Sequence, residues 1–219
     1  PNDGHVDPSS VTNAYAKAAK AKGAEIYLRN PVIELKQTAK GGWLVVTKDG
    51  TLEADYVVNA AGLWAREVGK LAGVDLPIIP MEHQYIVTND IPAVAALGKE
   101  IPMSIDFDGE SYLRQEGKGL LIGTYEHDCL HWAVKGTPQD FAHELLPNDV
   151  DRIWSALEVA MERYPCLVDG GIKRVINGPF TFAPDGNPLV GPVRGLRNFW
   201  TACGVMAGLG AAINTGAVT

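Results

Sequence analysis

Hydrophobic and polar residues alternate with a period of two along the first third of the chain, which is typical of strands that bury one face. These strands are predicted at 32–37, 43–48 and 51–54. Gly41-Gly42 and Asp49-Gly50 lie between them, and Gly-Gly and Asp-Gly dipeptides both favour tight hairpin turns. The pattern therefore predicts an antiparallel meander.

Helical periodicity is clearest in three segments. Residues 10–23 are rich in alanine, with Asp7 or Ser9 available as the N-cap and Gly23 at the end. Residues 65–71 predict a short helix. Residues 150–164 predict an amphipathic helix whose apolar positions recur with a period near 3.6 residues. Further strands are predicted at 25–28, 56–60, 82–88, 111–115, 120–125, 171–178 and 199–203.

The order of these elements predicts an α/β fold that is α+β in part. A helix, a strand, a meander, a strand and a helix form part of a doubly wound domain. After residue 75 the prolines become frequent and the strands predict a second, mostly antiparallel sheet. We therefore expect one discontinuous domain from residues 1–75 and 193–219, and a second domain from residues 76–192.

Composition and charge exclude several classes of protein. The chain has 219 residues, 46% of them hydrophobic, which is enough for a sizeable core. Its net charge is −7, and basic residues do not cluster, so neither nucleic acid nor an anionic membrane is expected as a partner. No apolar run approaches the roughly 18 residues of a membrane span. The chain starts with Pro1 rather than Met, and its end resembles an interrupted helix, so we expect a piece of a longer enzyme.

Cysteine and histidine positions favour neither disulfides nor a metal. Cys129, Cys166 and Cys203 form no CxxC pair, which favours a reducing compartment. His127, Cys129 and His131 have the spacing of one strand face, but a closed zinc site needs four ligands and no partner cluster is visible. We interpret this segment as a solvated loop and predict no metal site.

Two glycine-containing turns follow apolar strands. One is Asn59-Ala60-Ala61-Gly62, and the other runs from Gly204 through Gly208 and Gly210. Small residues at a strand end let the backbone approach a cofactor closely, although ordinary strand-to-helix turns have the same composition. The Gly-x-Gly-x-x-Gly fingerprint of a dinucleotide site is absent from the chain.

His83 and Tyr112 are the chemical candidates. His83 shares a strand face with Met81 and Tyr85, and Tyr112 shares one with Arg114. Histidine titrates near neutral pH, and a tyrosine hydroxyl both donates and accepts hydrogen bonds. The alternative for His83 is a hydrogen-bonded core histidine. For Arg114, exposure to solvent is the favoured interpretation.

Taken in order, several runs of sequence resemble one family. They are residues 3–8, 57–69 (VVNAAGLWAREVG), 83–88 (HQYIVT), 112–115 (YLRQ), 120–126, 177–179 and 184–185. Together they resemble the dimethylglycine dehydrogenase and sarcosine dehydrogenase group of FAD-dependent amine oxidoreductases, in the D-amino-acid-oxidase-like superfamily.

The resemblance implies a fold, a reaction and site residues. A Rossmann-like FAD-binding domain, here residues 1–75 and 193–219, is interrupted by a domain that binds substrate and covers the flavin. Hydride passes from the methyl carbon of an N-methylated glycine to flavin N5, and leaves an iminium. His83 and Tyr112 match residues that line the substrate site, and Arg114 would hold the substrate carboxylate if its side chain pointed inward. Flavin-contacting positions match Val32, Ala60, Gly62, Val205, Met206, Ala207 and Gly208.

The resemblance also leaves alternatives open. The FAD fingerprint, the histidine that tethers flavin in close relatives, and the folate domain that would take tetrahydrofolate are not in this chain. We therefore expect the isolated polypeptide to bind FAD poorly and to be inactive.

The alternatives are an enzyme that acts on another amine or amino acid, or a non-catalytic module that keeps the fold. Oxygen and an electron-transfer flavoprotein are both open as electron acceptors, and bacterial cytoplasm is favoured over the mitochondrial matrix.

Overall fold

The computed structural model describes residues 6–142 and 144–206. The described chain forms two compact units, which are treated separately. Unit 1 contains Met81–Trp132 and Ala142–Phe180. Unit 2 contains Val6–Pro80, Ala133–Phe141 and the described residues from Thr181 onward. The assignment of residues 76–192 to substrate binding and of the remainder to FAD binding stays a prediction.

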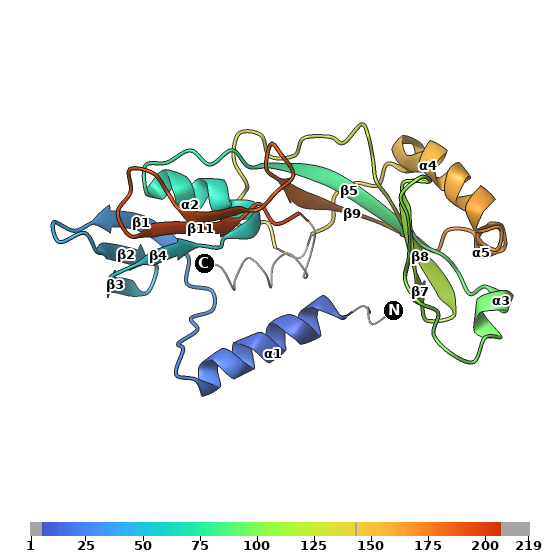
Figure 1. Ribbon diagram of the computed structural model, residues 1–219, viewed down its shortest axis with the longest axis horizontal. Coiled ribbons are helices and arrows are strands. Elements are labelled where there is room, and N and C mark those ends of the chain that lie inside the picture. Colours follow the sequence, from blue (N-terminus) through green and yellow to red (C-terminus); the bar gives the residue numbers. More distant parts are fainter. Residues whose placement is uncertain (1–5, 143, 207–219) are drawn as a thin grey trace. The chain divides into compact units, whose positions relative to one another are not determined.

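Unit 1 is built on a five-stranded sheet in the order β6-β7-β8-β5-β9 (Figure 1). Its strands are β5 (Ile79–Val87), β6 (Ser104–Asp106), β7 (Ser111–Glu116), β8 (Gly119–Thr124) and β9 (Arg174–Phe182). Its helices are α3 (Pro92–Ala95), α4 (Val150–Arg163) and α5 (Leu167–Gly170). The pairings of β6 with β7, β7 with β8 and β8 with β5 are all antiparallel.

One face of this sheet carries the core of unit 1. Leu113 on β7 and Ile86 on β5 both pair with Ile122 on β8, so the three side chains form one buried row. Ile153 and Leu157 of α4 belong to the same hydrophobic cluster. Helix α4 begins at the N-cap Asp149, whose carboxylate accepts a hydrogen bond from the Arg152 N–H.

The opposite face carries the next row along the strands. Tyr112 on β7 and Tyr85 on β5 both pair with Gly123 on β8. Because successive side chains of a strand alternate between faces, this row cannot join the core under α4. The predicted site residues Tyr112 and His83 therefore belong to the face that α4 does not cover.

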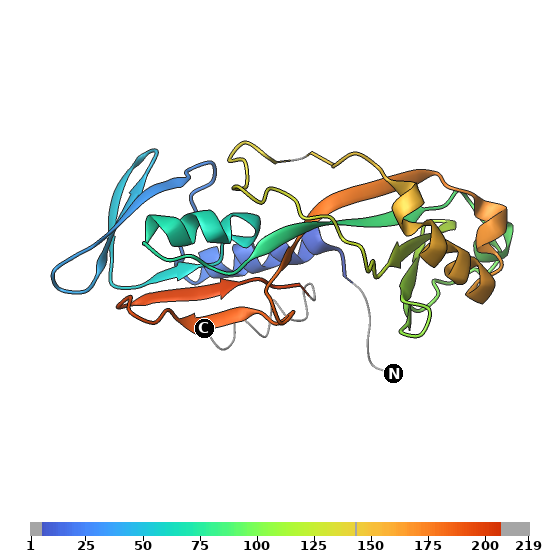
Figure 2. The same cartoon turned by 90° about the horizontal axis from the view of Figure 1, so that it is seen from above.

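Unit 2 contains two three-stranded sheets. The first has the order β1-β2-β3 and the second the order β10-β11-β4. The strands are β1 (Val32–Gln37), β2 (Trp43–Thr47), β3 (Gly50–Ala54), β4 (Val57–Asn59), β10 (Leu189–Pro192) and β11 (Phe199–Cys203). The helical segments are α1 (Pro8–Ala21), η1 (Gly62–Trp64) and α2 (Ala65–Leu71). Figure 2 shows the antiparallel pair β10 and β11 side by side.

The core of unit 2 joins the two sheets. Trp43 of β2 and Phe199 of β11 are both fully buried, with ring centroids 5.4 Å apart. Leu35 of β1 completes the same cluster, and α2 packs against β1 and β4. In contrast, α1 has no buried residue, and its N-cap Asp7 accepts a hydrogen bond from the Ser10 N–H of the same helix.

The mixed fold class with antiparallel sheets agrees with the prediction, and most elements lie where the pattern placed them. The meander, the helix at 65–71 and the strand at 199–203 are confirmed. The strand at 25–28 is wrong, because Tyr27 and Leu28 are exposed and the following Arg29 has a φ of 58°, which turns the chain. No helix among the described residues is long and apolar enough to cross a membrane.

The strand predicted at 171–178 lies later in the chain, as β9. Gly178 and Pro179 suggest a turn in the sequence, yet both are inside the strand. β9 is the last strand in the sheet order. Proline, which lacks an N–H, is tolerated there because the outward N–H groups of an edge strand form no inter-strand hydrogen bond.

Candidate functional site

The two predicted chemical residues meet on the uncovered sheet face of unit 1. The Tyr112 hydroxyl oxygen lies 3.4 Å from Nε2 of His83, although 29 positions separate the residues in the chain. Their rings are nearly parallel, at 23°, with centroids 6.4 Å apart. The contact spans β8, since His83 is on β5 and Tyr112 is on β7.

A glycine of the middle strand makes this contact sterically accessible. A Cβ atom built on Gly123 would lie 1.9 Å from Cζ of Tyr112 and 2.2 Å from its hydroxyl oxygen. Such distances are far inside van der Waals contact, so any side chain at position 123 would displace the Tyr112 ring. Gly123 thus lets Tyr112 lie flat across β8 towards His83.

Aromatic rings surround the pair. The Phe180 ring stacks on His83 with centroids 5.2 Å apart and an angle of 24°. Tyr125 packs against Tyr112 at 5.7 Å in a tilted arrangement. These apolar surfaces restrict the water that reaches the histidine ring and the phenol.

Glu126 lies beside the other nitrogen of His83. Its Oε1 is 3.6 Å from Nδ1 of His83 and accepts a 2.9 Å hydrogen bond from the backbone N–H of Gln84. Its Oε2 accepts a 2.7 Å bond from Nε of Arg152. The side chain is 2% exposed, so this carboxylate is held in a nearly dry position.

Arg152 joins two carboxylates of unit 1. Besides Glu126, it contacts Oε2 of Glu82 through Nη1 at 3.1 Å. Asn177 donates to the same Glu82 oxygen at 2.8 Å and to the Pro147 carbonyl at 2.7 Å. Burying charges costs free energy unless they are paired and hydrogen-bonded, and this network supplies both kinds of partner.

Gln84 attaches the start of α4 to the site strand. Its amide donates to the Asp149 carbonyl at 2.8 Å and its carbonyl accepts from the Asp149 N–H at 2.8 Å. The Gln84 side chain is fully buried. The reciprocal pair satisfies the buried Gln84 amide and both backbone groups of Asp149, and it places Arg152 within reach of Glu126.

Burial moves the pKa values of both candidate residues. Burial lowers the pKa of His83 from 6.5, an effect that Glu126 opposes and Arg152 assists. Burial raises the pKa of Tyr112 to about 12, with further increases from Tyr125 and Tyr85. At neutral pH the imidazole and the phenol are therefore both uncharged.

Arg114 shares the face of Tyr112 but has its own partner. Its Nη1 lies 2.8 Å from Glu116 and 3.3 Å from the Gln115 carbonyl, and about a third of its side chain is exposed. Glu116 is also 3.9 Å from Arg174. The charge of Arg114 is thus already compensated within its own strand.

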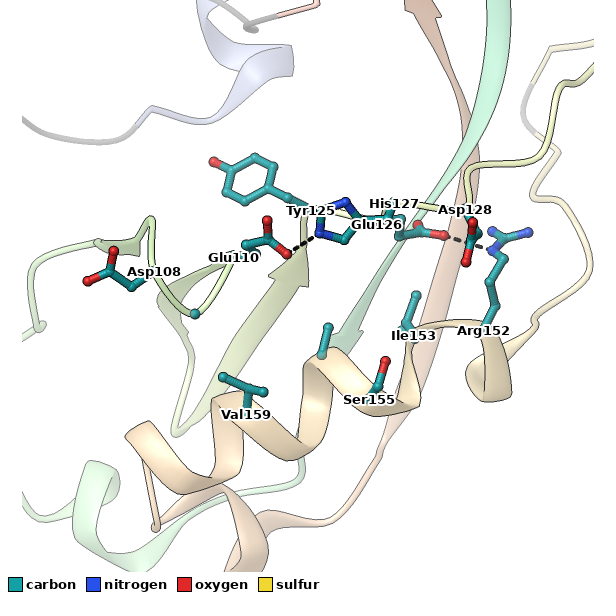
Figure 3. A pocket seen from close by; sticks show the side chains of 12 residues that line it. Asp108, Glu110, Tyr125, Glu126, His127, Asp128, Arg152, Ile153, Ser155 and Val159 are labelled. Carbon is teal, nitrogen blue, oxygen red and sulfur yellow. Dashed lines mark hydrogen bonds and ion pairs between the residues drawn. The ribbon is translucent and has the colours of Figure 1, made fainter.

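A separate cavity of about 280 Å³ lies between α4 and the ends of β7 and β8 (Figure 3). Its lining includes Glu126 and Arg152, but neither His83 nor Tyr112. His127 contacts Glu110 at its rim. Within the described ranges, no group of three or more His, Cys, Asp or Glu residues is arranged to hold a metal ion.

Unit 2 brings four of the predicted cofactor residues to one sheet edge. β4 and β11 run parallel, with Thr201 opposite Asn59, so the turns that follow them leave the sheet at the same end. Ala60 and Gly62 follow β4, and Val205 and Met206 follow β11. In open α/β sheets, ligands bind outside the carboxyl ends of the strands.

The first of these turns has an open backbone. Gly62 has a φ of 54°, and a Cβ atom there would meet nothing within 4 Å. Asn59, which is 2% exposed, shapes the turn by donating to the Ala65 carbonyl at 2.8 Å and accepting from the Ala61 N–H at 3.2 Å. Ala60 and Gly62 themselves are exposed.

The remaining predicted cofactor residues are less informative. Val32 begins β1 and packs, half-buried, against the cluster of Trp43 and Phe199. Ala207 and Gly208 lie outside the described residues. The flavin contacts of all seven positions stay a prediction, as do the substrate contacts of His83 and Tyr112.

Sequence reasoning missed the supporting residues Gly123, Glu126, Arg152, Glu82 and Phe180. One signal was available, because a glycine inside an apolar strand indicates close approach by another group. Charged Glu82 within the strand 82–88 was a second signal. Nothing in the sequence pairs Glu126 with Arg152, since that contact depends on where α4 begins.

Comparisons with known proteins identify the family. Residues 1–219 match the family described as FAD dependent oxidoreductase (DAO). The chain belongs to this family of FAD-dependent oxidoreductases. Mitochondrial dimethylglycine dehydrogenase of Mus musculus is 47% identical over 95% of the chain, and mitochondrial sarcosine dehydrogenase of Homo sapiens is 34% identical over 93%.

The chain spans about a quarter of the curated relatives, 25% of the mouse protein and 22% of the human one. Among solved structures, L-proline dehydrogenase from P. horikoshii is 26% identical, with a TM-score of 0.73 over 92% of this chain and 50% of that one. The recognition of the family from the sequence motifs is thereby confirmed.

Proposed function

We propose that this chain supplies substrate-binding residues and part of the flavin environment in an enzyme that oxidatively demethylates an N-methylated glycine, either dimethylglycine or sarcosine. Unit 1 binds the amine, and unit 2 contributes to the FAD site. The similarity to dimethylglycine and sarcosine dehydrogenases supports the substrate class.

The contact of His83 with Tyr112 is the observation that carries the proposal. Both groups are uncharged at neutral pH, so neither repels an ammonium group, and the Tyr112 oxygen has lone pairs that can accept a hydrogen bond from it. Oxidation of an amine requires the neutral form with a free nitrogen lone pair. Burial of the amine among aromatic rings favours this neutral form over the hydrated cation, because desolvation destabilises the charge.

Bound FAD would supply the acceptor for the hydride that leaves the substrate carbon. The residues that would hold it are the small ones at the edge of the parallel pair, Ala60, Gly62, Val205 and Met206. Their fit rests on the open space at Gly62 and on the shared end of β4 and β11. The protein residues bind and orient the amine and limit access of water.

The test is an absorbance spectrum of the natural protein that carries this chain, recorded before and after anaerobic addition of dimethylglycine. We expect a flavin band at ~450 nm that bleaches with dimethylglycine, because the flavin carries the redox change. A flavin band that ignores both dimethylglycine and sarcosine would move the substrate to another amine or amino acid. A protein without flavin would support the non-catalytic module instead.

The partners and the location belong to the same proposal. An electron-transfer flavoprotein is the proposed electron acceptor, and tetrahydrofolate on a following domain is the proposed acceptor of the one-carbon unit. Bacterial cytoplasm is the first proposed location and the mitochondrial matrix the second, and both relatives are named as mitochondrial proteins. Reoxidation of the reduced protein by oxygen, measured in stopped flow, tests the choice of electron acceptor.

A further inference from the structure

The two ring nitrogens of His83 have chemically different neighbours. Nδ1 lies 3.6 Å from Oε1 of Glu126, and Nε2 lies 3.4 Å from the Tyr112 hydroxyl. A carboxylate only accepts hydrogen bonds, whereas a hydroxyl donates as well as accepts. The neutral imidazole has a single N–H, and these two neighbours decide which nitrogen carries it.

The surroundings of Glu126 keep its carboxylate an acceptor. The Gln84 N–H donates to Oε1 at 2.9 Å, and Nε of Arg152 donates to Oε2 at 2.7 Å. Glu126 is 2% exposed, so water competes little for these oxygens. The carboxylate therefore turns a fixed negative edge towards Nδ1 of His83.

We propose that Glu126 is a positioning residue that holds the His83 proton on Nδ1, so that Tyr112 donates to Nε2 and turns its oxygen lone pairs towards a substrate ammonium group. The direction of the hydrogen bond between Tyr112 and His83 is then set by the carboxylate of Glu126, which lies 3.6 Å from Nδ1. The part concerning the ammonium group rests on the proposed function, whereas the part concerning the tautomer does not.

The opposite tautomer is disfavoured at both ends. It would place the Nδ1 lone pair against the negative carboxylate of Glu126. It would also make Nε2 the donor to Tyr112, whose hydroxyl hydrogen would then point away from the ring. A hydrogen in that direction repels the N–H groups of an ammonium ion, since two donors cannot pair.

The first experiment measures the tautomer directly. The natural protein is labelled with ¹⁵N-histidine, and His83→Gln identifies the signals of His83. We expect Nδ1 to show the chemical shift of a protonated nitrogen and Nε2 that of an unprotonated one at neutral pH. A protonated Nε2 with a bare Nδ1, or protons on both nitrogens, would overturn the proposal.

Two further variants test whether Glu126 is the cause. In Glu126→Gln the carboxylate becomes an amide that can donate to Nδ1, so the Nε2–H form of His83 should become a major species. Glu126→Asp, with a carboxylate withdrawn by one methylene, should show a smaller shift in the same direction. If both variants keep the wild-type tautomer, Glu126 does not position His83.

Glu82→Gln is the matched control. Glu82 also contacts Arg152, at 3.1 Å, so this variant removes a negative charge from the same arginine. The carboxylate beside Nδ1 of His83, however, is that of Glu126. We expect Glu82→Gln to keep the Nδ1–H form. An equal shift in this control would assign the effect to the arginine network rather than to Glu126.

Amine binding separates this inference from the proposed function. Glu126→Gln should weaken binding of dimethylglycine about tenfold, the loss of one hydrogen bond to a charged group. If the wild-type protein binds no N-methylated amine but His83 has the Nδ1–H form, the proposed substrate is wrong and the positioning role of Glu126 stands.

Discussion

The ring of Tyr112 lies directly over the α-carbon of Gly123, where a Cβ atom would come within 1.9 Å of Cζ. Gly123→Ala should therefore push the ring away from His83. We expect a loss of about 1–3 kcal/mol in the free energy of unfolding, as for other overpacked sites. Turnover should fall by about 100-fold, because displacements near 1 Å have such effects. Urea unfolding and steady-state kinetics measure the two quantities.

A double-mutant cycle provides the control for this prediction. In a Tyr112→Ala background the ring is absent, so Gly123→Ala should cost much less in stability than it does in the wild type. The difference is the coupling energy between the two positions. Equal costs in both backgrounds would show that the alanine disturbs the strand itself rather than the Tyr112 ring.

Removing the cation that pairs with the buried Glu126 and the partly buried Glu82 should be costly. Arg152→Met retains much of the side-chain volume but leaves Glu82 and Glu126 without their shared partner. Breaking a buried ion pair from one side typically costs about 3–5 kcal/mol. We expect a loss of that size in urea unfolding, together with altered binding of the amine.

Arg163→Met on the same helix is the control for Arg152→Met. Arg163 pairs with Asp106 at 3.3 Å, but 52% of its side chain is exposed. Exposed pairs contribute at most about 1 kcal/mol. A loss as large as that of Arg152→Met would contradict the assignment of the cost to buried charge.

The pH dependence of stability should reveal the neutral state of His83. Its pKa is lowered from 6.5 in the folded protein, chiefly by burial, so below that pH the unfolded chain binds a proton that the folded chain does not. Relative to His83→Gln, the wild type should lose stability as the pH falls below 6.5, and the difference should level off below the folded pKa. Urea midpoints from about pH 8 to about pH 5 test this. A difference that is constant, or that grows in acid, would contradict a buried neutral histidine.

Flavin content should depend on Gly62 more than on a comparable glycine. Gly62 and Gly73 both have positive φ, 54° and 80°, and a Cβ atom at either meets nothing within 4 Å. Alanine at each should cost a similar 1–2 kcal/mol or so, since the left-handed backbone is strained by any Cβ. Only Gly62→Ala should lower the ratio of FAD to protein in the natural protein. Equal flavin loss in both variants would remove Gly62 from the proposed cofactor edge.

Local signals explain which parts of the fold are predictable. The helix Ala65–Leu71 and the meander follow from periodicity and glycine turns within a few residues. The strand predicted at 25–28 shows the limit of such local signals, because a segment forms a strand only where a neighbouring strand pairs with it. β9 shows another limit, since only the sheet order reveals that Pro179 sits on an edge.

For the candidate site, too, the sequence predicts some features and not others. His83 and Tyr112 are recognisable as residue types on strands, and their strand faces follow from alternation. Their contact depends on the register of β5, β8 and β7, which brings Gly123 between them. The contact of Glu126 with Arg152 requires the position of α4, and that position depends in turn on the buried Gln84.

The parallel pairing of β4 with β11 has a consequence for the order of folding. Val57 pairs with Phe199, and the chain between them contains the whole of the sheet of unit 1. Contacts that close so long a loop are slow to form, because the entropy of closure is lost before the pairing compensates for it. During synthesis from the amino end, His83 and Tyr112 can therefore form their contacts before β11 has been synthesised and has paired with β4.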